Sequence, residues 1–310
     1  MDLKQCGRTG LYLSAIGIGT LTWGRDTDGP EALDMLRRFV DAGGNLVECS
    51  ASHGDGMAVD ILSEAISAVG RHRVAVAWRG GVRRASEGAW VSAAGRGDLL
   101  RSLDDALARL DTDYVDVWMV EPRAEVPLEE TLEAATAAYR SGRARYVGLS
   151  RATQWQLAEA VTRGVLGASA PISVVEFPFS LADTSRAARV AELSEHGVGV
   201  IAASALAGGA LTGKYRHSTP ADSRAASPHL RHLVEGHLTG SARGVIEAAT
   251  RAGAGLERST GDVALAWVRD YPGVTSALVG PRTLRQLETL LDYTEPLPAP
   301  IRQVLSEVAQ

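Results

Sequence analysis

The sequence is poor in cysteine and in long apolar runs. Cys6 and Cys49 are the only cysteines in 310 residues, too few for a disulfide framework and without the spacing or histidine partners of a zinc site. The apolar runs stay short of the roughly 18 residues that a membrane-spanning helix needs, and the first residues do not form a secretory signal peptide. We therefore expect a cytoplasmic protein that binds no metal and does not span a membrane.

Charge of one sign is not concentrated anywhere in the chain. Lys and Arg total 32 against 37 Asp and Glu, and the two signs are interleaved. Binding of nucleic acid, which needs a basic tract, is not expected. Aromatic residues make up only 5% but include six tryptophans, whose flat side chains line small-molecule sites as well as cores. An enzyme or a small-molecule binding protein remains, with an oligomer left open.

Short apolar runs alternate with amphipathic stretches along nearly the whole chain. The runs are rich in Val and Ile without strict polar alternation, which is typical of strands buried in a parallel sheet. They cover residues 16–19, 46–49, 74–78, 115–120, 145–149, 173–176, 198–203 and 276–279. Helical patterns cover residues 30–42, 99–110, 128–140, 154–162, 186–195, 263–268 (from about Ser259) and 284–291. Eight strand–helix units in series predict one α/β domain over residues 1–310, a (β/α)8 TIM barrel.

Two other segments bear on the fold. A hairpin over residues 3–13 is expected to close the bottom of the barrel. The competing fold, a doubly wound sheet, would need a glycine-rich phosphate turn after its first strand, and Gly17, Gly19 and Gly24 do not form one. Residues 215–240 break the rhythm and hold four of the seven histidines, which predicts a functional or mobile loop. Its histidines lack the Cys or carboxylate pattern of a metal site.

Several motifs occur in an order that carries a family resemblance. They are Gly17-Ile18-Gly19-Thr20 with Trp23-Gly24, residues 41–45, 113–116, 142–150 and 264–267, the stretch 204–215, and Gly280-Pro281-Arg282 with Gln286. Together they resemble the aldo-keto reductases, in the branch that includes bacterial tailoring enzymes and potassium-channel β-subunits. The resemblance implies a barrel that reduces carbonyls with NADPH, using Tyr as proton donor, Lys and Asp to tune it, and His to orient the substrate.

All four catalytic positions implied by the resemblance hold other residues. Glu48 stands at the Asp position, His53 at the Tyr position, Arg79 at the Lys position and Glu121 at the His position. These four are the predicted catalytic residues. Polar groups at the ends of barrel strands are where such folds place their chemistry, and random decay would more often leave small or apolar residues.

The resemblance also implies the residues that would contact NADPH. They are Thr20, Ser150, Arg151, Glu176, Ser204, Leu206, Gly208, Lys214, Arg224, Gly280, Arg282 and Gln286. The two amides that hold the nicotinamide in the family are Arg151 and Glu176 here, so the phosphate end is retained while the nicotinamide end is altered. Trp23 matches a family pocket residue, and Trp78 and Trp118 are further pocket candidates, with core packing as the alternative.

The substituted residues have chemistry of their own. A carboxylate beside His53 is expected to raise the imidazole pKa, and burial is expected to raise that of Glu121. Arg79 stays charged and can stabilise an oxyanion or pair with Glu48 or Glu121. His53, whose imidazole titrates near neutrality, is the expected proton shuttle. Three functions remain, in order of preference. They are redox-neutral acid–base chemistry (dehydration, epimerisation, isomerisation or cyclisation) on a small oxygenated molecule such as those of secondary metabolism, NADPH-dependent reduction of a carbonyl or conjugated substrate with another proton donor, and a non-catalytic binding or regulatory barrel.

Overall fold

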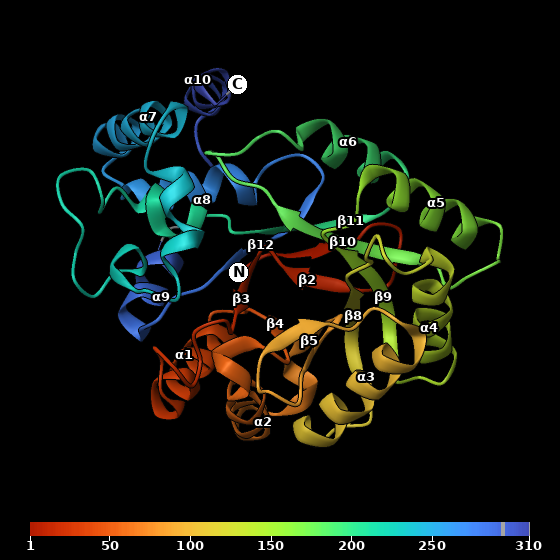
Figure 1. The fold of residues 1–310 in the computed structure, drawn as a ribbon. Helices are drawn as coiled ribbons and strands as arrows, with labels where there is room; N and C mark the ends of the chain where they lie inside the picture. Colours follow the sequence, from red (N-terminus) through yellow and green to blue (C-terminus); the bar gives the residue numbers. More distant parts are fainter. Residues whose placement is uncertain (293–294, 310) are drawn as a thin grey trace.

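A closed barrel of parallel strands forms the centre of the computed structural model, which describes residues 1–292 and 295–309. The strands pair in the order β10-β11-β12-β3-β4-β5-β8-β9, and helices surround them (Figure 1). They are β3 (Ile16–Gly19), β4 (Leu46–Ser50), β5 (Ala75–Gly80), β8 (Val115–Val120), β9 (Ala144–Ser150), β10 (Ile172–Pro178), β11 (Gly199–Ala203) and β12 (Val274–Val279). The predicted (β/α)8 barrel is confirmed, and the closed sheet excludes the doubly wound alternative.

Helices cover the outside of the barrel. They are α1 (Gly29–Asp41), α2 (Ala58–Val69), α3 (Arg96–Leu110), α4 (Leu128–Arg140), α5 (Gln154–Val165), α6 (Ala187–Glu195), α7 (Ser241–Leu256), α8 (Thr260–Arg269), α9 (Leu284–Leu291) and α10 (Ala299–Val308). The helical patterns in the sequence correspond to seven of these, while α2, α7 and α10 were not predicted. None of the helices formed by the described residues has the length and apolarity needed to cross a bilayer.

Side-chain caps mark the starts of four of these helices. The side chains of Asp28, Thr153, Ser259 and Thr283 each accept a hydrogen bond from a backbone N–H in the first turn of α1, α5, α8 and α9. Such a cap stabilises a helix by about 1 kcal/mol. The starts of the other six helices, α2, α3, α4, α6, α7 and α10, have no side-chain cap, so these helices depend more on packing against the barrel.

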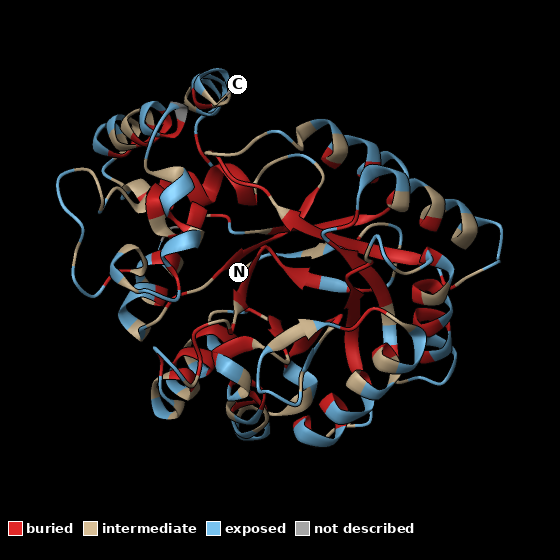
Figure 2. Cartoon of the chain, in the orientation of Figure 1, coloured by how far each residue is buried: buried red, intermediate tan, exposed pale blue. Residues whose placement is uncertain are grey.

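The barrel strands separate two hydrophobic cores. The larger core lies between the outer face of the barrel and the helices, while the smaller one fills the barrel interior. Figure 2 shows the buried strands at the centre and the exposed outer faces of the helices. Alternate residues of each strand face inward. The inward-facing side chains that fill the interior include Leu46, Ala75, Ala77, Val117, Met119, Val174, Ile201 and Leu278.

An N-terminal hairpin closes one end of the interior. Strands β1 (Leu3–Gln5) and β2 (Tyr12–Ser14) pair antiparallel, as predicted from the sequence. Cys6, Leu11 and Leu13 from this hairpin belong to the interior core. A second hairpin, β6 (Val82–Arg84) with β7 (Trp90–Ser92), was not predicted and follows β5 directly.

Candidate active site

Strand alternation places four charged side chains inside the mouth of the barrel. Leu46 faces the interior on β4, so Glu48 does too, and the same step of two leads from Ala77 to Arg79 and from Val174 to Glu176. On the fourth barrel strand, the same step leads from Met119 to Glu121, which lies just beyond the end of β8. Glu48, Glu121 and Glu176 are buried, with at most 7% of each residue exposed.

His53 joins this group from a turn that only its glycine permits. The turn η1 (His53–Gly56) follows β4, and Gly54 adopts φ of +56°. A Cβ atom on Gly54 would lie 1.7 Å from the carbonyl oxygen of Trp23, so a larger residue cannot occupy this position without moving the turn. The result is a buried imidazole, 2% exposed, directly above the end of β4.

The contacts of His53 determine its tautomer. Its Nε2 lies 2.9 Å from Nη2 of Arg79, and its Nδ1 lies 3.0 Å from Oγ1 of Thr20. Because a guanidinium can only donate, Nε2 accepts, and the proton resides on Nδ1. Burial, together with the charges of Arg79 and Arg151, lowers the pKa of His53 well below 6.5. The expected rise is therefore wrong: Glu48 Oε1 is 3.9 Å from Nε2, and its charge is outweighed.

Arg79 is the centre of the site. Its Nε lies 3.6 Å from Oε1 of Glu48, and its Nη1 lies 3.6 Å from Oε1 of Glu176. Ser150 donates a long hydrogen bond of 3.5 Å to the same Glu176 oxygen. One guanidinium thus faces two buried carboxyls and one imidazole. The charge of these four groups is balanced when one carboxyl carries a proton.

Both carboxyls around Arg79 hold protons more tightly than an exposed Glu. Burial raises the pKa of Glu48, against the lowering effect of Arg79 and Arg151. Burial likewise raises the pKa of Glu176 to about 7, opposed by Arg79 and reinforced by Glu48. Oε1 of Glu48 and Oε2 of Glu176 have no hydrogen-bond partner among the described residues. The orphaned Glu176 oxygen is therefore ready to meet a donor from a bound molecule.

Glu121 is near enough for its charge to act on Arg79 and Glu176, but its ion pair is with another cation. Nη2 of Arg123 approaches Oε1 of Glu121 to 2.9 Å. The sequence expectation allowed Glu121 to pair with Arg79, and the structure instead gives it this neighbour two residues along. Arg123 was not among the residues predicted from the sequence, although a cation two residues from an acid at a strand end is a usable signal.

A cavity of about 440 Å³ opens over these side chains. Its wall includes all four predicted catalytic residues, Glu48, His53, Arg79 and Glu121, and also Arg123, Arg151 and Glu176. The segment 215–240 contributes His229 and His232 to the wall. Leu230 and Val234 of the same segment are buried and pack it against the rest of the protein. Within the described parts of the chain, no group of three or more His, Cys, Asp or Glu is arranged to hold a metal ion.

A second cavity of about 300 Å³ adjoins the first. Its wall contains the predicted phosphate-end residues Ser204, Leu206, Gly208, Lys214, Arg224, Gly280, Arg282 and Gln286. Ser204, Gly208, Arg224 and Gly280 are among the residues that line both cavities. Of the other expected cofactor residues, Arg151 and Glu176 line the first cavity. Thr20 and Ser150 are not in either wall, but Thr20 contacts His53 and Ser150 contacts Glu176.

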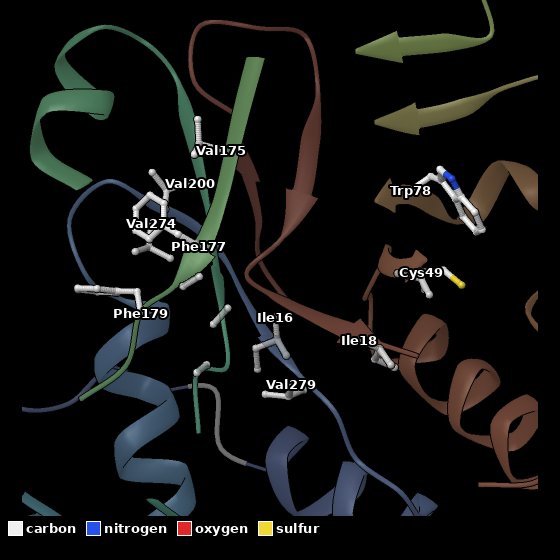
Figure 3. Packing of buried hydrophobic residues seen from close by; sticks show 14 of the residues in the cluster. Ile16, Ile18, Cys49, Trp78, Val175, Phe177, Phe179, Val200, Val274 and Val279 are labelled. Atoms are coloured by element: carbon white, nitrogen blue, oxygen red, sulfur yellow. The ribbon is translucent and has the colours of Figure 1, made fainter. Parts of the chain in front are cut away.

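The predicted pocket tryptophans lie in the core instead. Trp23, Trp78 and Trp118 are at most 1% exposed and belong to the core between barrel and helices. Trp78 and Trp118 each precede an inward-facing residue, so strand alternation turns them outward. Figure 3 labels Trp78 among these buried side chains, close to Cys49. The structure therefore supports core packing, and not a place in the pocket wall, for all three tryptophans.

Comparison with known proteins identifies the fold's relatives. The model of the Aldo/keto reductase family matches residues 15–304. The chain belongs to this family. Among the curated relatives, a probable voltage-gated potassium channel subunit beta of Oryza sativa subsp. japonica is 29% identical, and the match covers 99% of this chain and 95% of the rice protein. The L-glyceraldehyde 3-phosphate reductase of Escherichia coli (strain K12) is 29% identical, covering 93% and 86%.

Solved aldo/keto reductases share the architecture. The holo form of aldo-keto reductase AKR11C1 from Bacillus halodurans superposes with a TM-score of 0.82 at 22% identity, covering 100% of this chain and 97% of the other. The thermostable aldo-keto reductase Tm1743 gives a TM-score of 0.78 at 23% identity, covering 99% and 100%. At these identities the likeness establishes the fold, and the chemistry must be argued from the side chains present.

Proposed function

We propose that this aldo/keto reductase family member catalyses a redox-neutral acid–base reaction on a small oxygenated molecule. The observation that carries the proposal is Glu176, a buried carboxyl at the cavity wall whose pKa is raised to about 7. A group with that pKa is present in both protonation states near neutral pH, so it can take a proton in one step and return it in another.

Arg79 supplies the complementary role in this proposal. Its guanidinium stays charged at any physiological pH and lies in the cavity wall 3.6 Å from Glu176. A substrate oxygen that gains negative charge when a neighbouring C–H or C–O bond breaks would be stabilised by this fixed cation. Dehydration, epimerisation, isomerisation and cyclisation of a carbonyl compound all pass through such an oxygen. Glu176 and Arg79 together therefore suit this class of reaction.

His53, which the sequence suggested as the proton shuttle, has a positioning role in this proposal instead. Nε2 accepts from Arg79 while Nδ1 donates to Thr20, so both ring nitrogens are engaged. Its lowered pKa keeps the ring neutral near pH 7. Proton transfer therefore falls to Glu176, with Glu48 as the neighbouring carboxyl that raises its pKa further. The proposal includes the inference that Glu48, His53, Arg79 and Glu121 stand where the family has the Asp, Tyr, Lys and His used in carbonyl reduction.

Deuterium exchange tests the proposal without knowledge of the natural substrate. A panel of α-hydroxy and β-hydroxy ketones is incubated in D2O without nucleotide, and NMR follows deuterium uptake beside the carbonyl and loss of water. Glu176→Gln is expected to lower the exchange rate by about a hundredfold or more. Arg140→Gln, which changes an exposed residue at the end of α4, is the matched control. Exchange that proceeds equally in Glu176→Gln would exclude the assigned role.

A second candidate is NADPH-dependent reduction of a carbonyl or conjugated substrate. It is favoured by the 300 Å³ cavity, whose wall contains Lys214, Arg224 and Arg282. Burial and the charge of Arg282 lower the pKa of Arg224, so an anion bound there would relieve an existing repulsion. The chain's residues therefore fit the phosphate-bearing end of NADPH, which when bound supplies a hydride.

The other end of NADPH would meet a changed surface. The orphaned Oε2 of Glu176 can accept a hydrogen bond from a carboxamide N–H, which keeps the fit chemically sound. Fluorescence titration with NADPH tests this candidate. We expect Lys214→Ala to weaken NADPH binding by about tenfold, as for loss of one charge-assisted contact. The candidate is abandoned if NADPH fails to bind the unaltered chain in the micromolar range.

A further inference from the structure

We propose that the molecule bound in the 440 Å³ cavity carries an anionic group, a carboxylate or a phosphate ester, and that the guanidinium of Arg151 binds it. This inference rests on the proposed function, since it names the substrate class of the same site. It assigns a binding residue that the acid–base proposal does not use.

Arg151 is anchored by its backbone and uncommitted at its side chain. It follows β9 directly, and its backbone N–H donates to the carbonyl oxygen of Glu176 at 3.0 Å. Its φ is +53°, a left-handed conformation that is uncommon for a residue other than glycine. Within residues 1–292 and 295–309, the guanidinium of Arg151 has no hydrogen-bond or ion-pair partner, although it lines the cavity.

The other arginines of the cavity are already engaged. Arg79 faces Glu48 and Glu176, and Arg123 pairs with Glu121 at 2.9 Å. The two remaining arginines also have partners: Arg25 pairs with Asp26 at 3.0 Å, and Arg224 donates to the carbonyl oxygen of Gly280 at 2.7 Å. Arg151 is therefore the cavity cation that a bound anion can reach without breaking a protein contact.

The charge of the cavity has the sign that an anion requires. Five arginines and three glutamates line it, although the whole chain carries a formal charge of −5. A positive cavity in an acidic protein concentrates anions from solution and orients them on approach. A guanidinium also binds carboxylate or phosphate oxygens in pairs, which fixes the orientation of the bound group.

Arg151 lies close enough to the reactive groups to connect anion binding with proton transfer. Its charge lowers the pKa values of Glu48, His53 and Glu176. An anion on Arg151 would offset that charge, so Glu176 would hold its proton to higher pH. Glu176 is also faced by Arg79, Glu48 and Glu121, whose charges act on it whether or not the anion is present. The substrate's own charge thus favours the acid form of Glu176.

Calorimetric titration of the full chain with malonate and with inorganic phosphate tests the inference. Arg151→Gln should weaken binding by about tenfold or more, which is the loss of one charge-assisted pair. Arg151→Lys should fall between, because an ammonium lacks the planar fork. Arg140→Gln, an exposed arginine far along α4, is the control, and far-UV circular dichroism verifies that each variant is folded. Tighter binding of malonate indicates a carboxylate substrate, and tighter binding of phosphate indicates a phosphate ester.

A second variant separates the two cavities. Lys214→Ala removes a cation that lines the 300 Å³ cavity and not the 440 Å³ cavity. We expect this variant to leave the Arg151-dependent binding intact. Equal affinity in Arg151→Gln and the unaltered chain overturns the inference. Loss of binding in Lys214→Ala but not in Arg151→Gln overturns it as well, and so does an absence of binding by both anions in the millimolar range. No turnover is measured, so failure of the acid–base proposal would leave these results unchanged.

Discussion

Single residues set the charge balance of the site. Arg79 faces two buried carboxyls, while His53 is held neutral by its hydrogen bonds and surroundings. Taking charges out of water is expensive unless each is compensated. The arrangement is therefore stable with one cation and one anion, and the second carboxyl is the natural place for an exchangeable proton.

Removal of Arg79 should expose this dependence. Arg79→Met leaves Glu48 and Glu176 buried without their shared cation, and we expect a loss of about 3–5 kcal/mol in the free energy of unfolding at pH 8. The loss should shrink at pH 5, where the carboxyls hold protons. Urea denaturation at both pH values measures it. Adding Glu48→Gln and Glu176→Gln to Arg79→Met should restore stability, and a variant of unchanged stability at pH 8 would contradict the assignment.

Glu176 should make the protein less stable as the pH rises towards neutrality. Its folded-state pKa of about 7 lies above the ordinary value of 4.5. Between those values the unfolded chain releases a proton that the folded chain keeps, so the stabilising contribution is complete below pH 4.5 and lost by about pH 7. The loss amounts to about 3 kcal/mol. The difference in unfolding free energy between the unaltered chain and Glu176→Gln, measured across this range, should show that slope.

Much of the site follows from sequence at this scale. Strand alternation is enough to place Glu48, Arg79 and Glu176 on the inner face of their strands, and the family resemblance singled out the same positions. The direction of the His53 pKa shift did not follow. It depends first on the burial of the imidazole and then on the charges of Arg79 and Arg151, and the turn at Gly54, not a local sequence pattern, places the ring there.

At the scale of elements, the hairpin β6–β7 is fastened to the turn that carries His53. Trp90 Nε1 donates to Oδ1 of Asp55 at 2.8 Å, and Arg84 donates to the same oxygen at 2.7 Å. Arg84 also lies over the Trp90 ring. Because Asp55 is two residues from His53, these contacts join the hairpin to the turn that carries His53. Val82 of the same hairpin lines the cavity.

Loss of Asp55 should loosen the hairpin without unfolding the barrel. In Asp55→Ala, the side chains of Trp90 and Arg84 lose their common acceptor, and the amides of residues 82–92 should exchange hydrogen faster. Exchange mass spectrometry measures this, and Glu87→Ala, at the exposed tip of the same hairpin, is the control. Equal protection of residues 82–92 from hydrogen exchange in both variants would show that the contacts of Asp55 with Trp90 and Arg84 do not hold the hairpin.

Which elements the sequence predicts depends on how local their signals are. Helices α4 and α9 begin and end at the predicted residues, since amphipathic periodicity marks the first and a threonine cap the second. The hairpin β6–β7 has no such local signal. Its strands are three residues each, and its place is fixed by Asp55, which lies on another turn. Contacts of this kind become visible only in three dimensions.

At the scale of the whole molecule, the cysteines report on its two cores. Cys6 belongs to the interior core under the hairpin β1–β2, and Cys49 to the outer core. Burial raises the pKa of each thiol to about 12, so thiolate is scarce at neutral pH and reaction requires opening.

Thiol labelling should therefore follow opening of the fold. In the native protein, reaction with a disulfide reagent at pH 7 should be far slower than in urea, and Cys6 should react before Cys49 because lifting one hairpin exposes it. Mass spectrometry of partly labelled protein identifies the order. Cys6→Ala and Cys49→Ala give the matched single-thiol controls. Rapid labelling of Cys49 under native conditions would show that the outer core opens more readily than its burial indicates.

The two cavities share part of one wall, formed in part by Ser204, Gly208, Arg224 and Gly280. If a ligand in one cavity moves these shared residues or changes their charge, it changes the affinity of the other cavity for its own ligand. A ligand in the second cavity must then change the affinity of the first by the same factor. A ligand long enough to reach both would gain further, because its second half binds at the high local concentration set by the first. Fragments that each fill one side should therefore bind weakly alone, and joining them by a linker that passes Arg224 should raise their affinity well beyond that of either fragment.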